Sequence, residues 1–163
     1  KGAKSIETAT ALSNYGLAVA PLGRHAEAER AFQEAIGIQE RIRGRESFEV
    51  AQTLHNLALL YRNTDRFAEA LPVYERSQRI WTGLKQHGLL VMSYKDLAVL
   101  HSKAGDIPAA IAAAKRAVGQ LAKLPANIRD QVDEQMQLSA FLASLEAQPP
   151  RAAPTPAAAP AAA

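Results

Sequence analysis

The chain has 163 residues and a formal net charge of +3, and hydrophobic residues make up 48% of it. This length suits one domain, and so mild a charge does not by itself call for a nucleic acid partner. The absence of cysteine excludes a disulfide framework, a thiolate nucleophile and a sulfur-ligated zinc site. No stretch of about 18 residues is apolar throughout, so we expect no membrane span.

Three helical hairpins are predicted in chain order, because one segment occurs three times. Residues 12–35 align without a gap on residues 54–77, a shift of 42 residues, and a weaker third copy starts at Tyr94 with a shift of 40. A period of this size indicates stacked supersecondary units. The repeats are expected at about 5–46, 47–88 and 89–124.

Small residues recur at equivalent positions of the three copies. They are Gly16, Ala58 and Ala98 in the first helix, then Ala28, Ala70 and Ala110, and later Ala35, Ser77 and Ala117, in the second. Two helices approach to about 8–10 Å only where the side chains at the contact are small. The turns are expected at Gly23, Asp65 and Gly105, since these residue types tolerate left-handed backbone angles.

Larger residues at repeated positions are expected to fill the core. They are Leu12, Leu54, Tyr94, Tyr15, Leu57 and Leu97 in the first helices, with Phe32 and Tyr74 in the second. In the first copy, Pro21 should end or kink the first helix.

This pattern resembles the tetratricopeptide repeat, a helix-turn-helix unit. The second copy matches best, through Leu54, Leu57, Ala58, Tyr61, Phe67, Ala70 and Tyr74. The commonest period of the family is about 34, whereas 42 and 40 are similar to the long repeats of kinesin light chains and many bacterial sensor and scaffold proteins. The resemblance implies an all-α fold, a right-handed α-solenoid whose first helices line the inner surface. The first copy departs from the pattern at Val19 and His25, where aromatics are usual.

Two segments follow the repeats. Residues 127–147 have apolar residues at helical spacing and are interpreted as one C-terminal capping helix, started by Asn127. Asp130, Asp133, Glu134 and Gln137 would give it the polar outer face that the end of an array needs. The domain therefore spans 1–147, and the Pro/Ala-rich residues 148–163 are expected to be a disordered tail or a linker.

A peptide-binding groove is expected on the inner surface, at first-helix positions that the core does not use. These are Asn14 and Leu17, then His55, Asn56, Leu59, Arg62 and Asn63, then Lys95, Asp96, Val99 and Lys103. An amide can pair with any peptide group, because it both donates and accepts. The alternative is that the asparagines make local polar contacts between neighbouring helices.

The polar groove positions also suggest what kind of segment would bind. The first helices carry cations there, namely His55, Arg62, Lys95 and Lys103, so an acidic or carboxylate-bearing segment is favoured. Leu17, Leu59 and Val99 could hold its apolar side chains.

No active site is predicted. The four histidines lack the three- or four-residue spacing that zinc sites use, and no glycine-rich loop could cradle a phosphate. His25 and His101 are expected to be partly buried packing residues, and Trp81 to pack onto the next unit. We expect a non-catalytic protein-binding scaffold with no metal, no cofactor and no small-molecule substrate.

Other interpretations stay open. The chain could be a structural segment of a longer regulatory protein, or could form homo-oligomers through the edge of its first hairpin. Arg41, Arg43 and Arg45 could bind nucleic acid, although cations at a helix C-terminus also offset the helix dipole, which is the favoured interpretation. The chain starts without methionine or a visible signal peptide, so its location is open, with the cytoplasm favoured over the periplasm.

Overall fold

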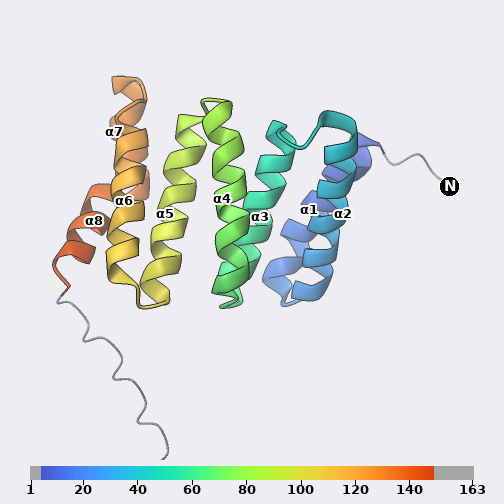
Figure 1. Cartoon of the computed structure of the whole chain (residues 1–163), viewed down its shortest axis with the longest axis horizontal. Helices are drawn as coiled ribbons and strands as arrows, with labels where there is room; N and C mark the ends of the chain where they lie inside the picture. Colours follow the sequence, from blue (N-terminus) through green and yellow to red (C-terminus); the bar gives the residue numbers. More distant parts are fainter. Residues whose placement is uncertain (1–4, 149–163) are drawn as a thin grey trace, which may run out of the picture.

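The computed structural model describes residues 5–148, and within them every regular element is a helix. The elements are α1 (Ile6–Val19), the 3-10 turn η1 (Ala20–Leu22), α2 (His25–Arg43), α3 (Phe48–Asn63), α4 (Phe67–Gly83), α5 (His87–Lys103), α6 (Ile107–Leu121), α7 (Ala126–Met136) and α8 (Leu138–Glu146). The hairpins α1–α2, α3–α4 and α5–α6 follow one another along the molecule (Figure 1). The expected all-α array of three hairpins is confirmed.

Equivalent residues begin and divide the first two hairpins. Ser5 and Ser47, one period of 42 apart, cap α1 and α3 by accepting a hydrogen bond from the backbone N–H three residues on. The three expected turn residues have the left-handed backbone that was predicted for them, with φ of 77° at Gly23, 58° at Asp65 and 83° at Gly105. A short polar or glycine residue is therefore needed at each turn.

Proline also acts as predicted in the first hairpin. Helix α1 ends at Val19, and Pro21 lies in the 3-10 turn that follows it. Proline lacks the N–H that would continue the α-helical ladder.

The repeated small residues form the contacts within the hairpins. All nine are buried, and the main core cluster contains apolar residues of all three hairpins together with Leu145 of α8. Gly16 packs against the ring of Phe32, which is 1% exposed. Trp81 is fully buried, in a cluster with Leu90 of the next hairpin, as expected.

Two expected core positions of the first hairpin are exposed. Tyr15 is 42% exposed, although the equivalent Leu57 and Leu97 are 5% exposed. Helix α2 packs on α3, and α4 packs on α5, whereas no described element covers the matching face of α1. The expectation for His25 was also wrong, because its side chain is exposed.

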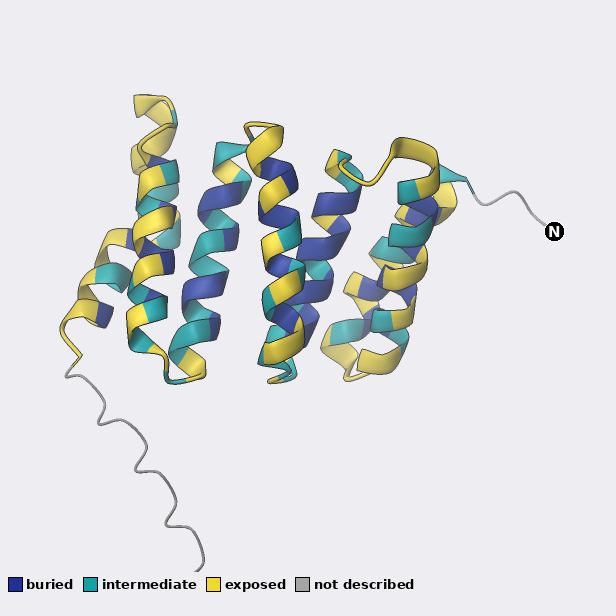
Figure 2. Cartoon of the chain, viewed as in Figure 1, coloured by how far each residue is buried: buried dark blue, intermediate teal, exposed yellow. Residues whose placement is uncertain are grey.

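The segment interpreted as one capping helix is divided into two. Gln137, with φ of 49°, separates α7 from α8, and the residue before α7 is Pro125, so Asn127 does not cap the helix. Helix α8 packs on α6 and brings Leu145 into the core. Helix α7 has no buried residue and is mostly exposed in Figure 2. Except for Gln148, the proposed tail lies outside the described residues.

We expect Gly16→Ala to destabilise the fold, although alanine is a better helix former by about 1 kcal/mol. An added Cβ would lie 2.7 Å from Cε1 of Phe32, and overpacking a core costs about 1–3 kcal/mol. Urea denaturation should therefore show a net loss of about 1 kcal/mol. The control is Gly37→Ala in α2, where an added Cβ meets nothing within 4 Å and stability should rise. A more stable Gly16→Ala variant would contradict this packing.

Candidate peptide-binding groove

A hollow of about 360 Å³ lies between the first hairpin and α3. Leu17, Leu59, Asn56 and Asn63, all predicted groove residues, are part of its lining. The other lining residues are Ala20, Pro21, His25, Phe32 and Leu60. The surface is mainly apolar, with amides among its polar groups, and Leu17 is 47% exposed.

Two predicted groove asparagines have side chains without a partner in the described part of the chain, and one of them lies at the hollow. Asn56 lines the hollow, and Asn14 lies one turn before Leu17 on α1; neither side chain makes a hydrogen bond there. The amide oxygen of Asn63 accepts bonds of 3.3 Å from its neighbour Arg62. The local polar contacts considered for the asparagines are therefore not seen at Asn14 or Asn56.

The equivalent position between the second and third hairpins is occupied by an ion pair. Arg62 of α3 donates to Asp96 of α5, and their side chains are 16% and 19% exposed. The Nε2 atom of His55 lies 3.4 Å from the other oxygen of Asp96. Two predicted groove residues, Arg62 and Asp96, therefore join neighbouring helices.

Two sequence differences explain why one junction is open and the other is filled. Arg62 is the equivalent of Ala20, and Asp96 is the equivalent of Asn56. The long guanidinium side chain of Arg62 reaches the carboxylate of Asp96, and this ion pair connects the two helices. Alanine and asparagine at the same positions leave space between α1 and α3.

His55 is not a groove residue, because it is 3% exposed and its ring contacts those of Tyr74 and Trp81. Burial, together with a smaller effect of the nearby Arg62 cation, lowers the pKa of His55 to about 4. Burial raises the pKa of Asp96, and Arg62 opposes that effect. At neutral pH, His55 therefore adds no positive charge to the groove.

The third hairpin offers little free positive charge either. The Nζ atom of Lys95 donates to the backbone carbonyl of Met136, at the end of α7. Val99 is half-buried, whereas Lys103 is exposed and has no ion pair in the described part of the chain. Of the four cations expected to make the groove basic, Lys103 alone is left free in the described structure.

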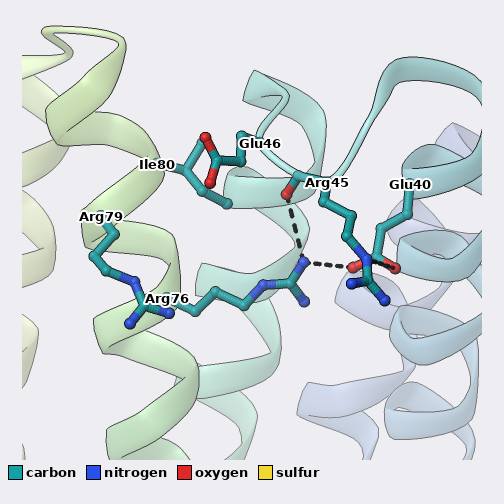
Figure 3. A pocket seen from close by; sticks show the side chains of 6 residues that line it. All are labelled: Glu40, Arg45, Glu46, Arg76, Arg79 and Ile80. Atoms are coloured by element: carbon teal, nitrogen blue, oxygen red, sulfur yellow. Dashed lines mark hydrogen bonds and ion pairs between the residues drawn. The ribbon is translucent and has the colours of Figure 1, made fainter.

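The basic cluster at the end of α2 is mixed with acidic side chains (Figure 3). Arg76 donates to Glu40 and to the carbonyl of Arg45, and Arg45 itself lies 3.9 Å from Glu40. The guanidinium of Arg43 is 3.8 Å from Glu49. These arginines therefore do not form a uniformly positive surface for a nucleic acid.

Other classes of site were also sought in residues 5–148. No helix there is both long and apolar enough to cross a membrane. No three His, Asp or Glu side chains there gather as a metal ion would require.

Three successive helical hairpins with an open hollow between the first hairpin and α3 define a helical-repeat array. The model of the tetratricopeptide repeat matches residues 7–82 and, in a second register, residues 49–121. The chain belongs to the tetratricopeptide repeat family. Repeats of this family generally mediate protein–protein interactions and are generally non-catalytic.

Solved structures share the fold. BtubC (BKLC) from P. vanneervenii is 17% identical, with a TM-score of 0.67, over 90% of this chain and 68% of that chain. A putative kinesin light chain from Podosopora anserina with nearly identical TPR-like repeats is 16% identical, with a TM-score of 0.65, over 86% and 71%. This likeness confirms the right-handed α-solenoid. No curated protein sequence matches the chain.

His55 should make stability depend on pH. Folding lowers its pKa from 6.5 to about 4, so its contribution is complete above pH 6.5 and is lost as pH falls toward 4. The whole shift corresponds to about 3 kcal/mol, and the raised pKa of Asp96 acts in the opposite direction. Urea denaturation across this range should show stability falling with pH, and falling less in His55→Phe. Equal slopes in the two proteins would be evidence against a buried neutral histidine.

Proposed function

We propose that the chain binds an extended segment of another protein in the hollow between α1 and α3. The observation that carries this proposal is one open site that combines an apolar lining with the unpaired side-chain amide of Asn56. An apolar pocket can hold a side chain of a bound peptide, and an amide can pair with its backbone.

An apolar side chain of the partner would be the anchor. The hollow is lined by Leu17 of α1, Phe32 of α2 and Leu59 of α3. Full burial of such an anchor contributes about 1.5–3 kcal/mol, and ordering the segment offsets part of this gain. Affinity would therefore depend mainly on one or two anchors.

The amides would fix the direction of the segment. Asn14 and Asn56 occupy equivalent positions in consecutive repeats, and each can donate to a peptide carbonyl and accept from a peptide N–H. Asn63 borders the same hollow, at the end of α3. Such contacts read the backbone and leave the choice of sequence to the anchor.

The hollow favours an uncharged anchor over an acidic one. Arg62 forms an ion pair with Asp96, and His55 is neutral at pH 7. Lys95 donates a hydrogen bond to the carbonyl of Met136 in α7. A carboxylate would find Lys103 only toward the third repeat. In place of the acidic segment expected from the sequence, we therefore propose a segment whose binding depends on an apolar side chain.

A random-peptide selection on the purified chain would test the proposal without a known partner. The same library would be selected in parallel on Ala20→Arg, which should fill the hollow as Arg62 fills the next junction. We expect peptides with a common apolar residue from the parent chain and their loss with Ala20→Arg. Enrichment of the same peptides on both proteins would refute the hollow as the site.

Affinity for a selected peptide should fall at least tenfold in Ala20→Arg, equal to about 1.4 kcal/mol. The double variant Asn14→Ala and Asn56→Ala should weaken binding with little change in thermal stability, because both side chains lack internal partners. The control is Ala112→Arg, since Ala112 is exposed on α6 and does not line the hollow. Calorimetric titration measures all three.

A further inference from the structure

No described helix packs on the outer face of α1. The equivalent faces of α3 and α5 are covered by α2 and α4. Ala11, Tyr15 and Ala18 are exposed along the α1 face, and Leu22 of η1 is 71% exposed. Their equivalents in α3 are Thr53, Leu57 and Leu60, which are 2%, 5% and 5% exposed because α2 packs on α3. The apolar character of the α1 face is thus that of a stacking surface.

A charged group beside this face shows what kind of helix would fit. In the second hairpin, Arg66 binds Glu69 of its own hairpin and Glu29 of the preceding α2, with its Nη1 atom 2.6 Å from Glu29. Glu29 also accepts a 2.9 Å bond from the hydroxyl of Tyr61. One carboxylate of the preceding helix therefore ties two residues of the next hairpin.

Arg24 and Glu27 reproduce half of that arrangement in the first hairpin. They are the equivalents of Arg66 and Glu69, and Nη2 of Arg24 lies 2.6 Å from Glu27. Arg24 also donates to the hydroxyl of Tyr15 at 3.2 Å. Its side chain is 49% exposed, and within residues 5–148 no carboxylate takes the place that Glu29 has beside Arg66.

The second junction shows that this charge pattern is not common to every repeat. Asp106 is the equivalent of Arg66 in the third hairpin, and the partly buried Leu71 is the equivalent of Glu29. A helix with the pattern of α4 would leave Arg24 without a carboxylate. The face of α1 therefore matches a helix with the pattern of α2.

We propose that the outer face of α1 binds the second helix of another helical hairpin, with a carboxylate of that helix seated on Arg24. A second copy of this chain does not supply such a helix, because α2, α4 and α6 are covered by α3, α5 and α8. This surface is separate from the hollow and does not rest on the function proposed for it.

Duplicating the first hairpin tests the proposal directly. A chain made of residues 1–46 followed by residues 5–163 keeps the period of 42 and places a second α2 against the α1 face. We expect one unfolding transition with a midpoint above that of the parent chain, and slower amide exchange in the downstream α1. A separate transition, or an unchanged midpoint, would overturn the proposal.

Variants of the duplicated chain test the ion pair itself. Arg24→Ala in the downstream hairpin should lower the midpoint more than the same change lowers it in the parent chain, and Glu29→Gln in the upstream copy should reproduce the loss. Arg30→Ala is the control, because Arg30 is exposed and its side chain donates only to its own helix. If Arg24→Ala lowered the unfolding midpoint equally in both chains, the proposal that a carboxylate binds Arg24 would be wrong.

The parent chain provides one further outcome. Light scattering should show a monomer. A dimer that Tyr15→Glu dissociates would assign the face to a second copy of the chain and overturn the proposal.

Discussion

The contact between a small first-helix residue and the second-helix side chain beside it sets the spacing of the array. In the first hairpin, Gly16 leaves so little room that an added Cβ would lie 2.7 Å from Phe32. Ala58 and Ala98 occupy the same position in the next two hairpins and are fully buried. The first helices of the second and third hairpins, α3 and α5, pack on the second helices of the hairpins before them, α2 and α4.

Side chains outside the core determine whether the space between two neighbouring hairpins is filled or open. The junction between the second and third hairpins is closed by Arg62 and Asp96, with neutral His55 beneath them. The junction between the first and second has Ala20 and Asn56 at the same places and stays open. One junction therefore contains an internal ion pair, whereas the other contains an open hollow with the unpaired amide of Asn56.

The sequence predicted the fold well because the repeat register reports residue types that the backbone requires. Left-handed Gly23, Asp65 and Gly105, and the buried alanines, could all be predicted from one alignment. The exposure of Tyr15 could not, because equivalence in a repeat does not say whether a neighbour covers the position. The break at Gln137 has no glycine or proline to signal it. The ion pair between Arg62 and Asp96 was not predicted. The repeat alignment does contain a signal for it, because the equivalent residues one repeat earlier, Ala20 and Asn56, are both uncharged.

The most direct measurement of the central claim is an NMR titration of the labelled chain with a peptide selected on it. We expect the side-chain amide signals of Asn14, Asn56 and Asn63 to shift, together with backbone signals of α1, η1 and α3. Signals around Asp96, where the junction is closed, should stay in place. Shifts centred on Asp96 or on α7 and α8, with the three amides unaffected, would contradict the view that the open first junction is the binding site.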